Sequence, residues 1–448
     1  MKKTIRHTAV DILNHVARSE AFAGDLLDAC LDEQSLSQTA DGRLLTHLVY
    51  GVLRMQGHLD WILEKLYRGD YVKMEDGVKN NLRTGLFQLK FSDRLPAFAV
   101  VDEAVKIAKR IAPAADGLTN AVLRSYLRNA DKMAFPSPEK NPAEYIAAFY
   151  SHPLWLTKLW LGVFGQEETI ALCQANNELP PLTLRVNTLK ISRPELAQRL
   201  KAEDFRCDLT QFSPDGLTLP DPPRPVQKTF FFKDGLLRLQ DEAAQLVSHL
   251  TDPQSGEDIL DVCAGTGGKT GHLAALMKND GRIVAVDRDA EKITQLKKDA
   301  ARMGISIVEA RQADLNHPLA PDYLEKFDRV LVDAPCSGTG TLRRNPEIKW
   351  RLKQGDIQSL AATQKTLLQN AAAAVKKGGC LIYCTCSLLS TENDDVVRQF
   401  LAVSPQFAIE IPHPTIVNTL SDSRGFFRTY PHRHGTDGFF GTVLRRRI

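Results

Sequence analysis

The sequence predicts a multidomain protein with a helical amino-terminal part and a carboxyl-terminal α/β fold built on a parallel sheet. Three observations predict it: the length of the chain, the helical spacing of apolar residues in its first part, and the alternation of strand-like and helical stretches in its last part. The chain has 448 residues, too many for one compact core. Apolar residues recur at helical spacing up to about residue 130, and from about residue 236 short β-rich runs alternate with helical stretches. The net charge of +3 permits a nucleic-acid partner without requiring one.

Residues 1–140 are predicted to form an all-α domain. Apolar side chains at helical spacing carry this prediction, among them Ala9, Ile12, Leu13, Val16, Leu45, Leu48, Val49, Val52, Val101, Ala104, Val105 and Ala108. Basic residues gather late in this part, at Lys106, Lys109, Arg110, Arg124 and Arg128. They fit a solvated helix face, and the alternative is an RNA-facing surface.

Residues 145–235 are predicted to form a small α/β subdomain. The prolines Pro136, Pro138 and Pro142 mark the linker before it. A helix-like stretch at 154–173 precedes residues 182–187, which alternate like a strand.

Residues 236–448 are predicted to form an α/β domain with helices on both faces of a parallel sheet. The expected strands are 259–262, 283–286, 305–308, 330–332 and 381–383, and the expected helices are 270–278, 290–303 and 357–375. Ligands of such sheets bind at the carboxyl ends of the strands. The arginines 445–447 read as a short basic tail.

A glycine-rich loop follows the first of these strands and opens a helix, where backbone N–H groups are free to face a ligand. It comprises Cys263, Ala264, Gly265, Thr266, Gly267, Gly268, Lys269 and Thr270. A P-loop NTPase is one interpretation, but Cys263 stands where its first glycine belongs. A dinucleotide site is another, but Thr270 stands at its last glycine position.

S-adenosylmethionine (SAM) is the third ligand that this loop could hold, and the one the pattern favours. Asp261 ends the first strand and Asp287 the second, where a carboxylate can accept hydrogen bonds from both ribose hydroxyls. Asp314 follows the next expected strand and could meet the adenine amino group. An acid after the second strand also suits NAD, so Asp287 does not discriminate alone.

Two cysteine-bearing turns at strand ends indicate covalent chemistry on a base. Asp333-Ala334-Pro335-Cys336 is the first, and Cys384-Thr385-Cys386 is the second. A thiolate that adds to C6 of a cytosine makes C5 nucleophilic toward a methyl donor, and a hydrogen bond from Asp333 to the ring would stabilise the adduct. The spacing alone leaves the two cysteines interchangeable. Cys384 and Cys386 form CxC rather than CxxC, so no metal is expected.

At these residues the chain resembles the bacterial RsmB (Sun/Fmu) family of 16S rRNA cytosine-C5 methyltransferases. The motifs that carry the resemblance include Thr385-Cys386-Ser387, Pro335-Cys336-Ser337-Gly338-Thr339-Gly340, Gln240-Asp241-Glu242-Ala243-Ala244, Arg185-Val186-Asn187 and Asp437-Gly438-Phe439-Phe440. It covers nearly the whole chain. It implies a NusB-like RNA-binding helical domain, a small α/β (RRM-like) subdomain and a Rossmann-like class I SAM-dependent methyltransferase domain.

The resemblance also implies a role for each candidate residue. Cys386 would be the nucleophile, Cys336 would assist product release, and Asp333 would position the base. The cofactor would be held by Cys263, Ala264, Gly265, Thr266, Gly267, Gly268, Lys269, Asp287, Asp314 and Asp333. The chain departs from the family at two points: Gly265 and Thr266 replace an Ala-Pro pair, and Cys384 replaces a serine and is interpreted as packing.

The expected activity is methyl transfer from SAM to C5 of one cytidine in 16S rRNA, either naked or in an assembling small subunit. The protein is expected to be cytoplasmic, because no apolar segment reads as a signal peptide or a membrane span. It is also expected to be a monomer. The alternatives are methylation of another RNA, a non-catalytic NusB-like RNA-binding or antitermination factor, and a P-loop NTPase.

Overall fold

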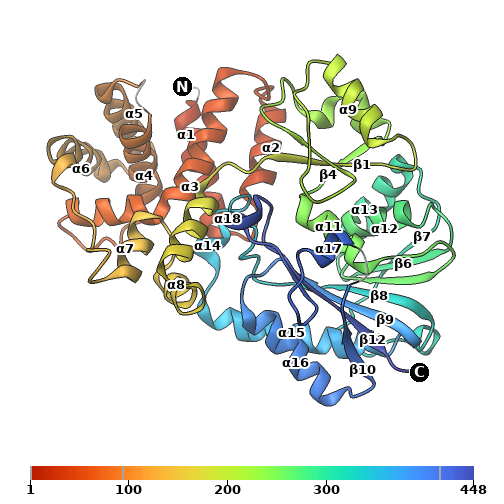
Figure 1. The fold of residues 1–448 in the computed structure, drawn as a ribbon. Helices are drawn as coiled ribbons and strands as arrows, with labels where there is room; N and C mark the ends of the chain where they lie inside the picture. The colour runs from red at the N-terminus through yellow and green to blue at the C-terminus, as the bar shows by residue number, and fades with distance from the viewer. Residues whose placement is uncertain (1–2, 93–94, 413–414) are drawn as a thin grey trace. The chain divides into compact units, whose positions relative to one another are not determined.

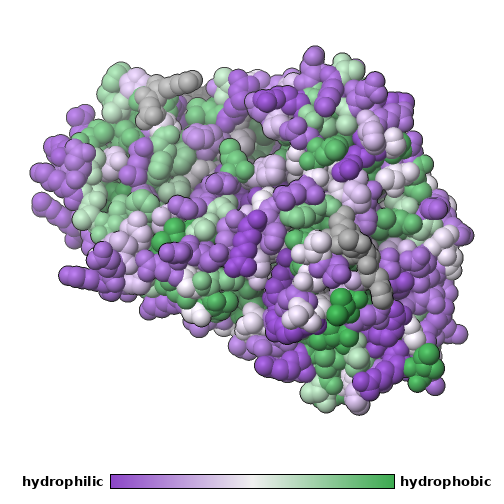
Figure 2. All heavy atoms as spheres, viewed as in Figure 1, coloured by the Kyte–Doolittle hydropathy of each residue, from purple (hydrophilic) through white to green (hydrophobic). Residues whose placement is uncertain are grey.

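The computed structural model describes residues 3–92, 95–412 and 415–448. The chain divides into two compact units. The first comprises Met1–Leu179 and Leu342–Leu352, and the second comprises Pro180–Thr341 and Lys353–Ile448 (Figure 1). On the face that Figure 2 shows, polar and apolar side chains are interspersed. Within the described residues, no helix has both the length and the apolar character needed to cross a membrane.

The first unit is helical, as predicted. Its elements are α1 Ile5–Arg18, α2 Ala23–Glu33, α3 Ala40–Leu66, α4 Asp76–Phe91, α5 Ala97–Ile111, η1 Pro113–Ala115, α6 Asp116–Asn129, η2 Ala130–Lys132, α7 Pro142–Phe149, α8 Leu154–Asn177 and α14 Ile348–Arg351. The apolar stripe of α1 is buried in one core with those of α3, α4, α5 and α6. Thr4 caps α1 by accepting a hydrogen bond from His7 N.

The segment Leu342–Leu352 belongs to the helical unit although the sequence before and after it belongs to the second unit. Lys349 anchors it. Its buried ammonium group donates to the carbonyl oxygens of Arg54 and Ser151 and to Oδ1 of Asn177, at 2.9 to 3.0 Å. Burial lowers the pKa of Lys349 to about 7, while three acceptors favour its charged form.

The second unit begins with a small α/β subdomain, and the helix-like stretch at 154–173 expected in it is α8 of the first unit. The sheet of the subdomain has the strand order β2-β3-β1-β4, and the registered pairs are antiparallel. The elements are β1 Leu182–Val186, α9 Arg193–Ala202, β2 Asp208–Leu209, β3 Gly216–Leu219, η3 Val226–Lys228, α10 Phe230–Lys233 and β4 Leu237–Leu239. It has an apolar core of its own, in which Leu184, Leu196 and Leu217 are fully buried.

The rest of the second unit is built on a larger sheet with the order β10-β12-β9-β8-β5-β6-β7, in which β11 also pairs with β12. Its elements are α11 Glu242–Thr251, β5 Asp258–Val262, α12 Gly268–Leu276, β6 Arg282–Asp287, α13 Ala290–Met303, β7 Val308–Gln312, η4 Pro321–Tyr323, β8 Phe327–Asp333, α15 Gln354–Ala372, β9 Val375–Thr385, η5 Ser390–Glu392, α16 Asp394–Val403, β10 Phe407–Glu410, α17 Thr415–Asn418, β11 Phe426–Arg428, α18 Pro431–His434 and β12 Phe440–Arg446. The strands β5 to β9 run parallel, as predicted, but β12 is antiparallel to β9. The sheet is therefore mixed.

The prediction of helices on both faces of this sheet is confirmed (Figure 1). Successive strand residues point to opposite faces, so Leu260 packs with Leu368 of α15 while Ile259 packs with Leu246 of α11 and Leu273 of α12. Both faces are thereby covered, and the open edge at the carboxyl ends of β5, β6 and β8 is left for a ligand.

Two local predictions are wrong. The strand expected at 305–308 is β7, which runs from Val308 to Gln312, because α13 ends at Gly304 with φ +76° and the chain needs several residues to turn back. The expected basic tail is the end of β12. There Arg445 forms an ion pair with Glu410, and Arg446 forms one with Glu325 at 2.5 Å.

Candidate active site

The glycine-rich loop joins β5 to α12 in a strained backbone conformation. Cys263, Gly265 and Gly267 all have positive φ, at +61°, +57° and +81°. The N–H of Gly267 donates to the carbonyl of Ala264 at 3.0 Å and closes a turn. A Cβ on Gly267 would lie 2.6 Å from Cγ of Leu296, so glycine is required there.

A cavity of about 190 Å³ lies at the carboxyl ends of the parallel strands. Its lining includes five of the predicted cofactor residues, namely Cys263, Gly265, Asp287, Asp314 and Asp333. Ala264, Thr266, Gly267, Gly268 and Lys269 do not line it and lie in the turn and at the start of α12. The structure therefore brings Asp287, Asp314 and Asp333 to one cavity. The other loop residues lie outside the cavity lining and support the loop.

The carboxylates around this cavity fit a ligand with hydroxyl and amino donors. Asp287 already orders the loop, because its Oδ2 accepts a hydrogen bond from Gly265 N at 2.8 Å. Asp314 is exposed, and hydrogen bonds from Asn316, chiefly from its backbone N–H, lower the pKa of its carboxyl. No atom lies within 4 Å of a Cβ built on Gly265, so that side of the loop is open. Acceptors and open backbone in this arrangement suit the ribose and adenine of SAM.

Asp261 plays a different part from the one the sequence suggested. It is fully buried, and its Oδ2 accepts a hydrogen bond from Thr270 Oγ1 at 2.6 Å, which ties β5 to α12. Burial raises the pKa of Asp261 to about 7. Asp261 is thus a support beneath the loop.

Asp333 lies between the cavity and the cysteine turns. Its Oδ2 is 2.5 Å from Nζ of Lys269, and its Oδ1 accepts a hydrogen bond from Cys384 Sγ at 3.3 Å. Burial opposes the charge on Lys269, but the neighbouring Asp333 outweighs it and raises the Lys269 pKa. Cys384, interpreted from the sequence as packing, is buried and also orients Asp333. Burial, followed by the charge of Asp333, raises the pKa of the Cys384 thiol.

The two predicted cysteines are brought together. Sγ of Cys336 lies 3.2 Å from Sγ of Cys386. The hydrogen bond with Cys386, followed by burial, raises the pKa of Cys336 well above its usual range. A raised pKa favours the protonated thiol at Cys336, and the two sulfur atoms share one hydrogen bond.

A buried carboxylate that sequence reasoning missed holds both cysteine turns. Oε1 of Glu392 accepts hydrogen bonds from Ser337 N at 2.8 Å and Gln364 Nε2 at 2.9 Å. Oε2 accepts from the hydroxyls of Ser337 and Ser387, each at 2.5 Å. Ser337 follows Cys336 and Ser387 follows Cys386, so one side chain fixes the turns together. The sequence offered no signal for Glu392 beyond its place six residues after Cys386.

One further polar cluster joins the small subdomain to the larger sheet's helices. Nε2 of His249 and Nε2 of His272 lie 2.9 and 3.0 Å from Oδ2 of Asp215, the one three-residue group of potential metal ligands within the described residues. Metal-bound histidines normally hydrogen-bond through their other ring nitrogen, but His272 Nδ1 is buried without a partner. We interpret the cluster as a hydrogen-bonded joint.

The basic residues of α5 and α6 lie on solvated helix faces. Lys106 pairs with Asp102 at 2.7 Å, Lys109 with Asp116 at 3.9 Å, and Arg124 donates to Asn120 at 2.8 Å. Exposed pairs of this kind are weak, typically about 0 to 1 kcal/mol, so they leave the basic groups available to phosphates.

A Rossmann-like sheet with acids around a cavity at its carboxyl edge, next to a pair of cysteines, defines a methyltransferase of the class that uses SAM. Comparison with known proteins agrees. Residues 248–445 match the family described as 16S rRNA methyltransferase RsmB/F, residues 3–128 match the NusB family, and residues 152–227 match the ferredoxin-like domain of RsmF/B-like methyltransferases.

Curated relatives match over nearly the whole chain. The probable ribosomal RNA small subunit methyltransferase B of Bacillus subtilis is 36% identical, with 100% of both chains covered. The ribosomal RNA small subunit methyltransferase B of Pseudomonas syringae is 35% identical over 89% of this chain and 86% of its own. The chain therefore belongs to the RsmB/F family and is a SAM-dependent rRNA methyltransferase.

Solved structures share the fold. The crystal structure of PH0851 superposes with a TM-score of 0.85 at 28% identity, with 100% of both chains covered. NSun6 from Pyrococcus horikoshii with SFG superposes with a TM-score of 0.59 at 23% identity, over 65% of this chain and 97% of its own.

Proposed function

We propose that the protein methylates C5 of a specific cytidine in 16S rRNA through a covalent adduct between Cys386 and C6 of the base. The observation that carries the proposal is the 3.2 Å approach of Cys336 and Cys386 beside the cavity. Two thiols placed together at strand ends suit a reaction that needs one nucleophile and one proton-handling group.

Each residue has a defined task in this reaction. Cys386, as a thiolate, forms the S–C6 bond, and the electron pair released to C5 forms the new bond to the methyl carbon. SAM, when bound, supplies that electrophilic methyl group and leaves as S-adenosylhomocysteine. Asp333 faces the base, where its carboxylate accepts a hydrogen bond from the ring nitrogen when that nitrogen is protonated, while Lys269 and Cys384 hold the carboxylate in place. Flipping the base out of its stack costs a few kcal/mol.

Cys336 completes the cycle. Its sulfur lies 3.2 Å from that of Cys386, which places it beside the adduct. Once the Cys336 thiol has released its own proton to solvent, its thiolate accepts the C5 proton of the methylated base. Loss of that proton breaks the S–C6 bond, and Cys386 leaves as a thiolate.

The cofactor is proposed to lie in the 190 Å³ cavity, with Asp287 toward the ribose hydroxyls and Asp314 toward the adenine amino group. The RNA is proposed to meet residues 1–140, with the subdomain at 145–235 and the catalytic domain at 236–448 completing the chain. A monomer acting in the cytoplasm, on naked rRNA or on an assembling subunit, suits a ribosomal RNA substrate.

The experiment that tests this proposal combines two variants with tritiated SAM and 16S rRNA. Cys386→Ala should abolish methylation, and Cys336→Ala should accumulate a slow-migrating protein–RNA species on a denaturing gel. Cys30→Ala, in the helical unit, controls for loss of a thiol and should keep full activity. Normal turnover by Cys386→Ala, or no adduct with Cys336→Ala, would contradict the roles proposed. Bisulfite sequencing of the product shows which cytidine is modified.

A further inference from the structure

The loop that borders the cofactor cavity has a composition that does not hold one shape by itself. Three of the four residues from Gly265 to Gly268 are glycines, and each glycine adds backbone entropy that folding must overcome. Nothing lies within 4 Å of a Cβ built on Gly265, so packing does not restrain that residue.

An arginine from the small subdomain contacts this loop directly. Nη2 of Arg238, on β4, donates to both the carbonyl oxygen and Oγ1 of Thr266, each at 3.0 Å. Its Nη1 forms an ion pair with Asp299 of α13, which fixes the guanidinium from the other side. The ion pair with Asp299 is largely buried, with side chains 14% and 10% exposed, whereas the contacts with Thr266 lie at the surface.

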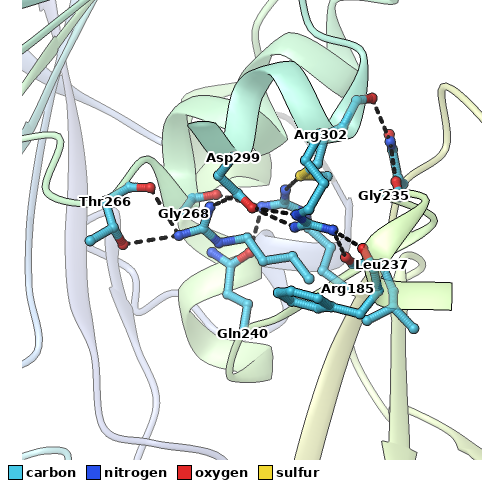
Figure 3. A network of polar contacts seen from close by, with 12 residues as sticks. Arg185, Gly235, Leu237, Gln240, Thr266, Gly268, Asp299 and Arg302 are labelled. Atoms are coloured by element: carbon cyan, nitrogen blue, oxygen red, sulfur yellow. Dashed lines mark hydrogen bonds and ion pairs between the residues drawn. The ribbon is translucent and has the colours of Figure 1, made fainter. Parts of the chain in front are cut away.

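A second arginine supports the next part of the loop. Nη1 of Arg185, on β1, donates to the carbonyl of Gly268 and to Oε1 of Gln240, each at 2.5 Å. Asp299 is held in turn by Arg302 of the same helix (Figure 3). The loop is therefore attached to the small subdomain through two guanidinium groups.

We propose that Arg238 is a positioning residue that holds the loop from Gly265 to Gly268 in its SAM-binding conformation, so that the small subdomain helps to form the cofactor site. The inference rests on the proposed location of SAM in the cavity at Asp287. Arg238 does not line that cavity, and it acts through Thr266.

The backbone at Thr266 offers a specific way to test this role. Gly265 has positive φ, whereas Thr266 is not among the described residues with positive φ. Together with the hydrogen bond from Gly267 N to Ala264 O, this is the pattern of a type II′ turn with Thr266 at its second central position. Within the described residues, the Thr266 N–H makes no backbone hydrogen bond. Proline fixes φ near −65° and lacks that N–H, so it would lock the same turn without an arginine.

The experiment measures SAM binding by calorimetry to the full-length wild type and to Arg238→Met, Thr266→Pro and the double variant. Arg238→Met should weaken SAM binding by about tenfold, as expected for loss of charge-assisted hydrogen bonds. Thr266→Pro alone should bind at least as tightly as the wild type. The SAM affinity of the double variant should return to within about threefold of the wild-type affinity. Proline would hold the turn by itself, so the contacts of Arg238 with residue 266 would no longer be needed.

Two further variants separate the contact with Thr266 from the general loss of an arginine. Thr266→Val removes only the hydroxyl contact, retains Arg238 and should weaken binding by about threefold. Arg282→Met removes an exposed arginine that pairs with Glu309 and should leave affinity unchanged. Wild-type affinity in Arg238→Met, or a double variant as weak as Arg238→Met, would overturn the positioning role.

Failure of the cofactor site itself gives a different result. If Asp287→Ala binds SAM as tightly as the wild type, the proposed site is wrong and this inference fails with it. If Asp287→Ala weakens binding and Arg238→Met does not, the site stands and only the role of Arg238 is rejected.

Discussion

Asp333 belongs to both halves of the proposed site. One carboxylate oxygen faces Lys269 at the start of α12, and the other faces Cys384 on β9. The residue also lines the cavity. A change at Lys269 or Cys384 should therefore alter the orientation of the Asp333 carboxylate, which is proposed to face the base, even though neither residue lines the cavity.

Glu392 gives a prediction at the scale of a single residue. Its carboxylate accepts four hydrogen bonds from Ser337, Ser387 and Gln364 and is fully buried. In Glu392→Gln one of the two acceptor oxygens becomes an NH2 donor and the negative charge is lost, so the hydrogen bonds that hold the two cysteine turns are weakened. We expect kcat to fall by about tenfold, because small misplacements of reacting groups are costly.

The KM for SAM is the informative second measurement on Glu392→Gln. Glu392 does not line the cavity, so this KM should stay near the wild-type value. Glu309→Gln, an exposed carboxylate that pairs with Arg282 and Arg311, is the matched control. An unchanged kcat, or a KM that rises in step with the loss of activity, would contradict a role confined to the cysteine turns.

Residues with local signals could be predicted from the sequence, and residues that act through folding could not. Cys336, Asp333 and Asp287 follow recognisable strands, so their meeting at one sheet edge follows from strand polarity. Glu392 and Arg238 stand in ordinary local sequence. Glu392 contacts a residue 55 positions away in the sequence, and Arg238 contacts one 28 positions away. The periodicity of apolar residues does not predict contacts at such separations.

At the scale of elements, the alternation of strand-like and helical stretches in the sequence does not predict the antiparallel strand β12. Three arginines at its end read as a tail, yet Val443 and Leu444 are buried and the strand pairs with both β9 and β10. Acidic partners on neighbouring segments, Glu410 and Glu325, compensate the arginines. Strand propensity depends on such tertiary partners, which is why the pattern of a parallel sheet extended only to β9.

The small subdomain also depends on tertiary contacts that its local sequence does not reveal. It is joined to the larger fold by the hydrogen bonds of Asp215 to His249 and His272, and by the contacts of Arg185 and Arg238. These contacts reach α11, α12 and the cofactor loop. The small subdomain, which has its own apolar core, thereby supports the proposed site beside it.

At the scale of the whole molecule, the chain passes between its two compact units three times, after Leu179, Thr341 and Leu352. The segment Leu342–Leu352 begins directly after the turn that carries Cys336 and is held in the helical unit by Lys349. All four tryptophans, Trp61, Trp155, Trp160 and Trp350, lie in this unit, so their fluorescence reports its unfolding.

His58 makes the stability of this unit depend on pH. It is 4% exposed among Phe91, Phe135 and Phe149, and its Nδ1 donates to the carbonyl of Phe149 at 3.0 Å. Burial lowers the pKa of His58 to about 4. Between about pH 6.5 and about pH 4 the unfolded chain binds a proton that the folded unit does not, so the free energy of unfolding falls as pH falls.

His58→Gln keeps an N–H donor for the Phe149 carbonyl but does not titrate, so it should remove this dependence. Urea unfolding followed by tryptophan fluorescence should show the wild type losing about 1.5 kcal/mol more than His58→Gln between about pH 6.5 and about pH 5, where the slope rises toward about 1.4 kcal/mol per pH unit. His152, whose pKa burial also lowers, is present in both proteins and cancels in the difference. Equal losses in the two proteins would mean that His58 is protonated in the folded unit, which its apolar surroundings oppose because a buried charge needs a partner.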